Sequence, residues 1–197
     1  MKNLVHKTLQ YFRVAYKVCH SELAKNLVHK TFQHFKVTYK GEQLMEIRPA
    51  IHNDIEQICL LYNEFFAYNA KIDPVYCRAG KESGEYPKSV IESTDAGLIV
   101  AAENNKLLGF IHIREGRTPP YDALMQNHYA QIIDFIVTEK HREKGIGTKL
   151  MEAAKDWANK RKLNYIELFV LDGAKAEHRF YENNDFTPVF HTMRCML

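Results

Sequence analysis

The strongest constraint on the fold is a nearly continuous apolar run over residues 128–138, which glycines and then an amphipathic stretch follow. A charged side chain interrupts the run only at Asp134. A strand that is apolar at successive positions is buried on both faces, and such strands lie in sheets that helices cover. The run therefore predicts a strand in the middle of the sheet of an α/β protein.

From Met45 onward, strand-like and helix-like segments alternate. The order is strand, two helices, three strands, helix, strand, helix and two strands. The periodicity predicts strands over 45–48, 97–102, 107–113, 128–138, 164–170, 186–190 and 192–197. Helices are predicted from an N-cap at Asn53 to the Asp73-Pro74 break, and over 88–94, 145–162 and 174–183, with a polar loop at 78–87.

The basic charge of the chain is confined to residues 1–44. They carry a formal charge of +6, whereas residues 45–197 carry −3, which gives the total of +3. Residues 2–17 recur at 25–40 with 12 identities in 16 positions. Two copies are fewer than a solenoid needs, so the segment is predicted to be a basic N-terminal extension. A basic arm for nucleic acid is the alternative, but the charges are spaced out, and no nucleic-acid partner is predicted.

Composition excludes several classes of protein. With 46% hydrophobic and 26% charged residues, the chain is that of an ordinary globular protein. No apolar stretch approaches the roughly 20 residues that span a bilayer, and the start lacks the apolar core of a signal peptide, which predicts a cytoplasmic protein without membrane association. The cysteines are scattered, and no group of His, Cys, Asp or Glu has metal-ligand spacing, so neither a disulfide framework nor a metal site is predicted.

A turn rich in glycine and basic residues joins the apolar strand to the next helix. Gly145 and Gly147 allow the backbone to approach a ligand closely, and the start of a helix presents unpaired N–H groups at the positive end of its dipole. Arg142 adds a forked, charge-assisted contact that suits a pyrophosphate. The turn therefore predicts an anion site, with a plain tight turn as the structural alternative.

These residues resemble a known family. The pattern Arg142-x-x-Gly145-x-Gly147 after an apolar strand is similar to the acetyl-coenzyme A motif, Arg/Gln-x-x-Gly-x-Gly/Ala, of the GNAT N-acetyltransferase superfamily. Residues 180–186 resemble the family's later Phe-Tyr-x-x-x-Gly-Phe segment, with Asp185 in place of glycine and Ala174 where an asparagine often contacts the cofactor. For residues 45–197 the resemblance implies a mixed, mostly antiparallel sheet with a splayed pair of fourth and fifth strands and helices on both faces.

The resemblance also implies acetyl-CoA as co-substrate and a set of residues that bind it. Backbone groups of Phe135, Ile136 and Val137 would bind the pantetheine arm. The pyrophosphate would be held by Arg142, Glu143, Lys144, Gly145, Ile146, Gly147 and Thr148. Tyr181 corresponds to the tyrosine that protonates the departing thiolate, with a tyrosine that merely packs its helix as the structural alternative.

Asp134 is the candidate for orienting or deprotonating the acceptor amine. Burying a carboxylate is costly unless it is partnered or functional, and the stretch around it resembles that of polyamine-type acetyltransferases, where acids line the amine site. Two interpretations stay open, orientation or deprotonation of the amine through water, and a structural hydrogen bond. Gln131, at odd separation from Asp134, is predicted on the other face of the strand. Weaker candidates at the acceptor mouth are Tyr62, Tyr68, Tyr76, Arg78, Tyr86, Glu115 and Tyr121.

Together these features predict an N-acetyltransferase that moves the acetyl group of acetyl-CoA to a primary amine of a small molecule by direct attack. The −3 charge of residues 45–197 favours a cationic acceptor. Two alternatives remain, a non-catalytic acyl-CoA-binding module of the same fold, which Ala174 and Asp185 favour, and an acetyltransferase of protein N-termini or lysines. The fold is compatible with a homodimer, which no residue pattern establishes.

Overall fold

A computed structural model of the chain describes residues 45–197, so the predicted N-terminal extension lies outside the described residues. Their sheet has the order β1-β2-β3-β4-β5, with antiparallel pairs up to β4 and a parallel β4–β5 pair. The strands are β1 (Glu46–Pro49), β2 (Ala96–Glu103), β3 (Lys106–Arg117), β4 (His128–Val137) and β5 (Ile166–Leu168). The helices are α3 (Ile55–Ile72), α4 (Glu85–Glu92), α5 (Ile146–Lys160) and α6 (Lys175–Glu182), with short 3-10 turns η1 (His52–Asp54) and η2 (Glu139–His141).

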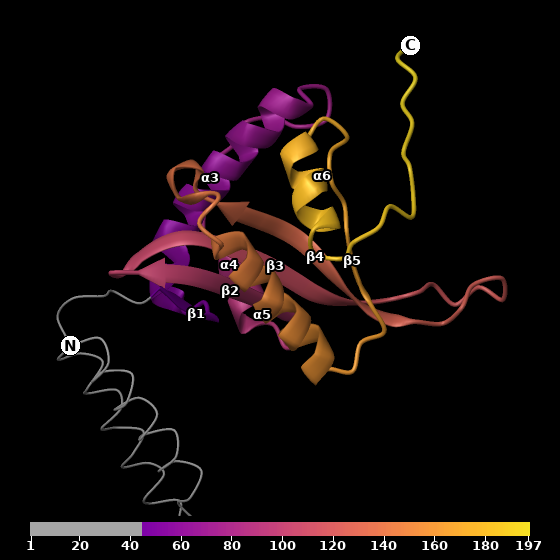
Figure 1. The fold of residues 1–197 in the computed structure, drawn as a ribbon, viewed down its shortest axis with the longest axis horizontal. Helices are drawn as coiled ribbons and strands as arrows, with labels where there is room; N and C mark the ends of the chain where they lie inside the picture. The colour runs from indigo at the N-terminus through magenta and orange to yellow at the C-terminus, as the bar shows by residue number, and fades with distance from the viewer. Residues whose placement is uncertain (1–44) are drawn as a thin grey trace, which may run out of the picture. The chain divides into compact units, whose positions relative to one another are not determined.

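Helices cover both faces of this sheet, which confirms the predicted fold class. Alternation along β2 sends Leu98 and Val100 into a cluster with α3 and α4, and Ile99 and Ala101 into a second cluster with α5. In Figure 1, α5 crosses in front of the strands. Within residues 45–197, no helix is long and apolar enough to cross a membrane.

A β-bulge in β4 decides which way Asp134 faces. Asp134 lies opposite His112 on β3, whereas the next residue of β3, Ile113, lies opposite Ile132. Ile133 is therefore an extra residue in β4, which interrupts the alternation of side chains. Ile132 packs in the α5 cluster, but Asp134 turns to the face that α3 covers. Without the bulge, Asp134 would follow Ile132 into the opposite core.

The same bulge overturns the expectation for Gln131. Gln131 lies opposite Arg114, which is two residues from His112 on β3 and therefore on the same face. Because Asp134 lies opposite His112, Gln131 and Asp134 share the α3 face despite their odd separation. The prediction assumed unbroken alternation and was wrong.

The fourth and fifth strands splay apart, as expected. β4 pairs with β5 only through 130–132 and 166–168, so residues 133–137 continue beyond the pairing. The sequence predicted a longer fifth strand at 164–170, and it placed β4 in the middle of the sheet. The central strand is β3, and the chain leaves the sheet after Leu168, so that Phe169 is 83% exposed.

The predicted terminal strands 186–190 and 192–197 do not form. No strand follows α6 within the described residues, and the C-terminal segment runs away from α6 (Figure 1). Pro188 has no N–H to donate to a ladder, and Phe190 and Met193 remain exposed instead of packing. An ion pair between Arg194 and Asp73 (2.8 Å) ties the segment to the end of α3.

Two helix starts also differ from the prediction. The second helix begins at Glu85, inside the predicted loop 78–87, because Gly84 takes the left-handed conformation (φ 98°) before it. Pro87 fits in the first turn, where backbone N–H groups have no intrahelical partner. Asn53 is not an N-cap, because it lies within η1 and the α-helix begins two residues later.

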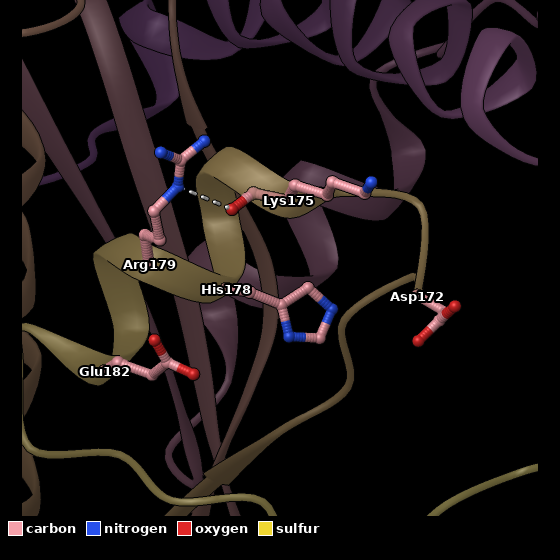
Figure 2. Close-up of a pocket in the computed structure, with 5 residues that line it drawn as sticks. All are labelled: Asp172, Lys175, His178, Arg179 and Glu182. Carbon is pink, nitrogen blue, oxygen red and sulfur yellow. Dashed lines mark hydrogen bonds between the residues drawn. The ribbon is translucent and has the colours of Figure 1, made fainter.

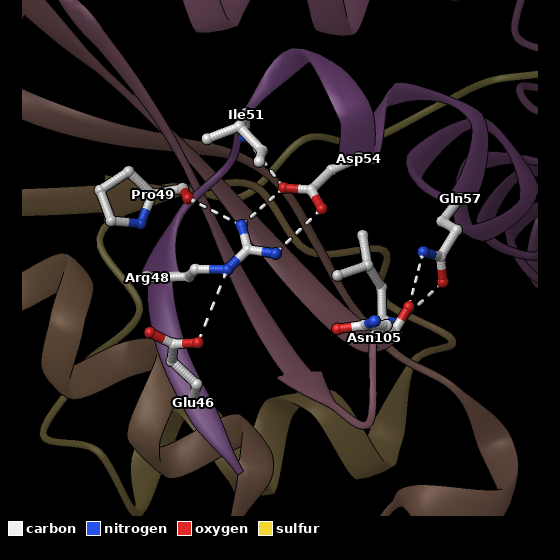
Figure 3. A network of polar contacts seen from close by, with 8 residues as sticks. Glu46, Arg48, Pro49, Ile51, Asp54, Gln57 and Asn105 are labelled. Atoms are coloured by element: carbon white, nitrogen blue, oxygen red, sulfur yellow. Dashed lines mark hydrogen bonds and ion pairs between the residues drawn. The ribbon is translucent and has the colours of Figure 1, made fainter. Parts of the chain in front are cut away.

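Polar contacts hold the start of α3 on the sheet (Figure 3). The Arg48 guanidinium makes two bonds to the Asp54 carboxylate (2.6 and 3.0 Å), which lowers the pKa of Asp54 and raises the pKa of Arg48. One turn on, the Gln57 amide donates to the Asn105 carbonyl (3.0 Å) and accepts from the Leu107 N–H (2.9 Å). These contacts fix α3 relative to β1, β2 and β3, and so place the side chains that α3 presents to β4.

Candidate active site

The turn between β4 and α5 has the geometry of an anion site. Glu143 and Gly145 both take left-handed conformations (φ 60° and 76°), and Gly145 is the N-cap of α5. A Cβ on Gly145 would meet nothing within 4 Å, so its backbone conformation rather than space favours glycine there. The first helical bond runs from the Lys149 N–H to the Gly145 carbonyl (3.2 Å), which leaves the N–H groups of residues 146–148 without helical partners.

The predicted pyrophosphate and pantetheine residues therefore lie on one continuous segment. Phe135, Ile136 and Val137 end β4, beyond its pairing with β5, and Arg142 follows η2. The Arg142 Nε donates to the Val137 carbonyl (3.1 Å), and its guanidinium carbon lies 4.8 Å from the centre of the Tyr68 ring on α3. Glu143, Lys144 and Thr148 are exposed, whereas Ile146 is buried in the α5 cluster.

Tyr181 on α6 lies against the end of β4. Its ring centre is 6.4 Å from that of Phe135, and the neighbouring Phe180 ring packs 5.5 Å from Phe135. A Cβ on Gly147 would approach the Phe180 ring to 3.2 Å, so glycine also allows α6 to pack closely on α5. Burial and the charge of Glu177 raise the pKa of Tyr181.

Asp134 lies at the centre of a polar cluster that α3 and α4 cover. Its Oδ2 accepts from the Tyr62 hydroxyl (2.9 Å) and lies 3.2 Å from Nδ1 of His112, which in turn lies 3.2 Å from the Tyr86 hydroxyl. His112 is 3% exposed and the Asp134 side chain 13%. Burial and the charge of Asp134 raise the pKa of Tyr62, and the same two causes raise the pKa of Tyr86 to about 12.

The sequence did not single out His112. A histidine inside the apolar run 107–113 is as unusual as Asp134 in its own strand, and that polar interruption was the available sign. The residue that His112 faces depends on the bulge at Ile133, so the sequence alone could not show it.

Of the weaker candidates, Tyr62, Tyr68 and Tyr86 reach the site. Tyr76, Arg78 and Tyr121 are exposed, and Glu115 pairs with His128 (2.7 Å) and Arg161 (3.2 Å) toward the other end of β4.

Glu177 is the second residue that sequence reasoning missed. Its Oε1 accepts from the Tyr68 hydroxyl (2.6 Å), while its Oε2 is buried without a hydrogen-bond partner. Glu177 and Tyr181 are four residues apart on α6 and share a helix face. Tyr68 thus contacts both Glu177, through its hydroxyl, and Arg142, over its ring.

A cavity of about 330 Å³ lies on another face of α6 (Figure 2). It is lined by Asp172, Lys175, His178, Arg179 and Glu182, none of which was predicted to bind ligand. Its walls are charged and open to solvent, and the Arg179 Nε bonds only the helix carbonyl of Lys175 (3.4 Å). This cavity is therefore distinct from the candidate site at the β4–α5 turn. Residues 45–197 contain no group of three side chains suited to hold a metal ion.

Comparison with known proteins agrees with this geometry. The profile of the Acetyltransferase (GNAT) family matches residues 55–186, and the chain belongs to this family. An uncharacterized N-acetyltransferase of Archaeoglobus fulgidus is 28% identical over 141 residues, which are 72% of this chain and 92% of that protein. Among solved structures, a mutant of the BH1408 protein from Bacillus halodurans superposes with a TM-score of 0.74 at 22% identity, over 78% of this chain and 99% of that one. The aminoglycoside N-acetyltransferase AAC(6')-Iy in complex with CoA gives a TM-score of 0.59 at 12% identity, over 80% and 99% of the two chains.

Proposed function

We propose that the protein transfers the acetyl group of acetyl-CoA to a primary amine of a small molecule by direct attack of that amine. One observation carries the proposal. The unpaired end of β4 leads into the open helix start of α5, and the Tyr181 ring packs against Phe135 in that strand end, an arrangement that suits a pantetheine arm, a pyrophosphate and a thioester sulfur. Membership of an acetyltransferase family supports the same reaction.

The residues present fit the donor substrate. Beyond residue 132, β4 has an edge that β5 does not pair, and there the backbone of Phe135 to Val137 can bind the amides of a pantetheine arm as an added strand does. The amides of residues 143–148 and the Arg142 guanidinium can hold the pyrophosphate. Only the Arg142 Nε bonds the Val137 carbonyl, so the other N–H groups of the guanidinium remain for the phosphate. Bound acetyl-CoA supplies an activated acyl group.

Two side chains carry the chemistry in this proposal. Tyr181 gives its phenolic proton to the departing sulfur, a role that the packing of its ring against Phe135 at the end of β4 supports. Asp134 orients the acceptor amine through Oδ1, because its contacts with Tyr62 and His112 both involve Oδ2. Those contacts hold the carboxylate still, so the structural hydrogen bonds and the orienting role support each other.

The acceptor is a cationic small molecule in this proposal. Residues 45–197 carry a net charge of −3, which draws cations toward the domain. An aminoglycoside acetyltransferase among the structural neighbours shares the fold and supports a small-molecule amine as acceptor.

The test is release of CoA thiol from acetyl-CoA in the presence of a panel of primary amines, including small polyamines, aminoglycosides and lysine peptides. Tyr181→Phe should lower kcat by about 100-fold, because a general acid contributes that much or more, and should leave acetyl-CoA binding by calorimetry unchanged. Tyr165→Phe, which removes a partly exposed hydroxyl from a ring stacked on Tyr129, is the matched control and should keep full activity. Acetyl-CoA binding without thiol release from any amine would instead support the non-catalytic module, and release only with peptides a protein acetyltransferase.

A further inference from the structure

The unpaired oxygen of Glu177 needs a partner. Oε2 is the one buried side-chain oxygen or nitrogen in residues 45–197 that has no hydrogen bond. Leaving a buried acceptor unsatisfied costs about 1–3 kcal/mol, and more when the group is charged. A buried atom without a hydrogen bond calls for an explanation such as a catalytic role, and the mechanism above gives Glu177 no task.

The surroundings of Glu177 match the acetyl-transfer step. Tyr181 is one helical turn further along the same face of α6, and the charge of Glu177 is close enough to raise its pKa. From α3, the Tyr68 hydroxyl fixes Oε1 at 2.6 Å, and Arg142 lies over the Tyr68 ring at 4.8 Å. These are the titratable and charged groups that the described contacts bring near the carboxylate, and none of them donates a hydrogen bond to Oε2.

We propose that Glu177 is a catalytic residue, whose Oε2 accepts the proton that the acceptor amine loses as it attacks the thioester. This inference rests on the acetyltransferase activity proposed above. In the step, a bond forms between the amine nitrogen and the acetyl carbon and the bond from that carbon to sulfur breaks. Glu177 takes the proton from nitrogen, and Tyr181 gives its own proton to sulfur. Glu177 then returns a proton to the Tyr181 phenolate, so that the net transfer is from nitrogen to sulfur.

Asp134 is less suited to this role. Its Oδ2 is shared between the Tyr62 hydroxyl and His112, and its Oδ1 is the atom that orients the acceptor amine in the function proposed above. Glu177 has one oxygen held and one without a donor, as a proton acceptor requires. The geometry thus divides the two carboxylates between orientation of the acceptor and removal of its proton.

The test compares Glu177→Gln with the wild-type protein. Glutamine keeps the shape and an oxygen for Tyr68 but cannot accept a proton, so kcat should fall by about 100-fold. Calorimetry should give a Kd for acetyl-CoA within about 2-fold of wild type, which a general loss of structure would not allow. Glu177→Ala should regain activity on addition of formate, because a small carboxylate can replace the missing base. Glu182→Gln, on an exposed face of the same helix, is the control and should change none of these values.

Three results decide the matter. Wild-type kcat in Glu177→Gln, or no recovery of Glu177→Ala with formate while it binds acetyl-CoA normally, would overturn the role of Glu177 and leave the acetyltransferase proposal intact. If Glu177→Ala does not fold, the isosteric Gln variant decides alone. No thiol release by the wild-type protein with any amine would overturn the proposed function itself, and this inference with it.

Discussion

Substitution of Gly109 on β3 tests how closely the last residues of β4 must pack against β3. It lies opposite Val137, and a Cβ on it would sit 2.4 Å from the Ile136 carbonyl oxygen and 3.0 Å from the Val137 Cα. Ordinary contacts begin at 3.4 Å, and both atoms belong to the backbone, which cannot rotate away as a side chain can. Gly109→Ala must therefore push the last residues of β4 outward by about 1 Å, since the packed interior offers no void.

The expected cost has two parts. Overpacking a core costs about 1–3 kcal/mol, and each weakened ladder hydrogen bond about 1 kcal/mol. We expect the free energy of unfolding to fall by about 2–4 kcal/mol and the Tm by roughly 5–15 °C. Because the displaced residues are those proposed to bind pantetheine, acetyl-CoA affinity should also fall by about 10-fold, or about 1.4 kcal/mol.

Urea unfolding followed by circular dichroism measures the first quantity, and calorimetry the second. Gly116→Ala is the matched control in the same strand, because its Cβ would meet only the outer atoms of the Tyr129 ring at 2.7 Å. That ring can turn aside, so the loss of stability should stay below about 1 kcal/mol. Equal losses in the two variants would refute the reasoning, because they would show that the backbone of β4 yields as easily as a side chain.

Two further predictions concern the anion site and the start of α3. Arg142→Gln should weaken acetyl-CoA binding by about 10-fold in calorimetry, because a charge-assisted fork is lost, whereas Lys144→Gln on the exposed turn should have a smaller effect; equal effects would argue against a specific role for Arg142. Asp54→Asn should lower the free energy of unfolding at pH 7 by about 2 kcal/mol, because the bidentate contact with Arg48 loses its charge. The hydrogen bonds from Arg48 hold the folded-state pKa of Asp54 below the ordinary value of an aspartate, so its contribution is present above that ordinary value and is lost as the pH falls through the folded-state pKa. The gap between wild type and Asp54→Asn in urea unfolding should therefore persist at pH 4 and narrow below it, and a gap that widens in acid would contradict the assignment.

Local patterns in the sequence determined much of the fold and the cofactor side of the site. The positions of the second to fourth strands and of α3, α5 and α6 follow from hydrophobic periodicity, which each segment carries by itself. The turn at Gly145 follows from a residue type that accepts a positive φ, and the open N–H groups after it are a property of any helix start. Arg142 and Tyr181 could be singled out as candidates for the same reason, since each stands in a short motif whose geometry is local.

Tertiary structure alone decided which side chains lie beside the proposed acceptor site. The bulge at Ile133 turns Asp134 toward His112 and puts Gln131 on the same face, because register between strands depends on both strands at once. Glu177 meets Tyr68 across 109 positions of sequence, a contact that no local pattern encodes. The C-terminal residues alternate as strands do, but a strand needs an edge to pair with, and β5 ends after three residues. Short-range chemistry thus determined where acetyl-CoA is expected to bind, and long-range packing decided which side chains stand beside it.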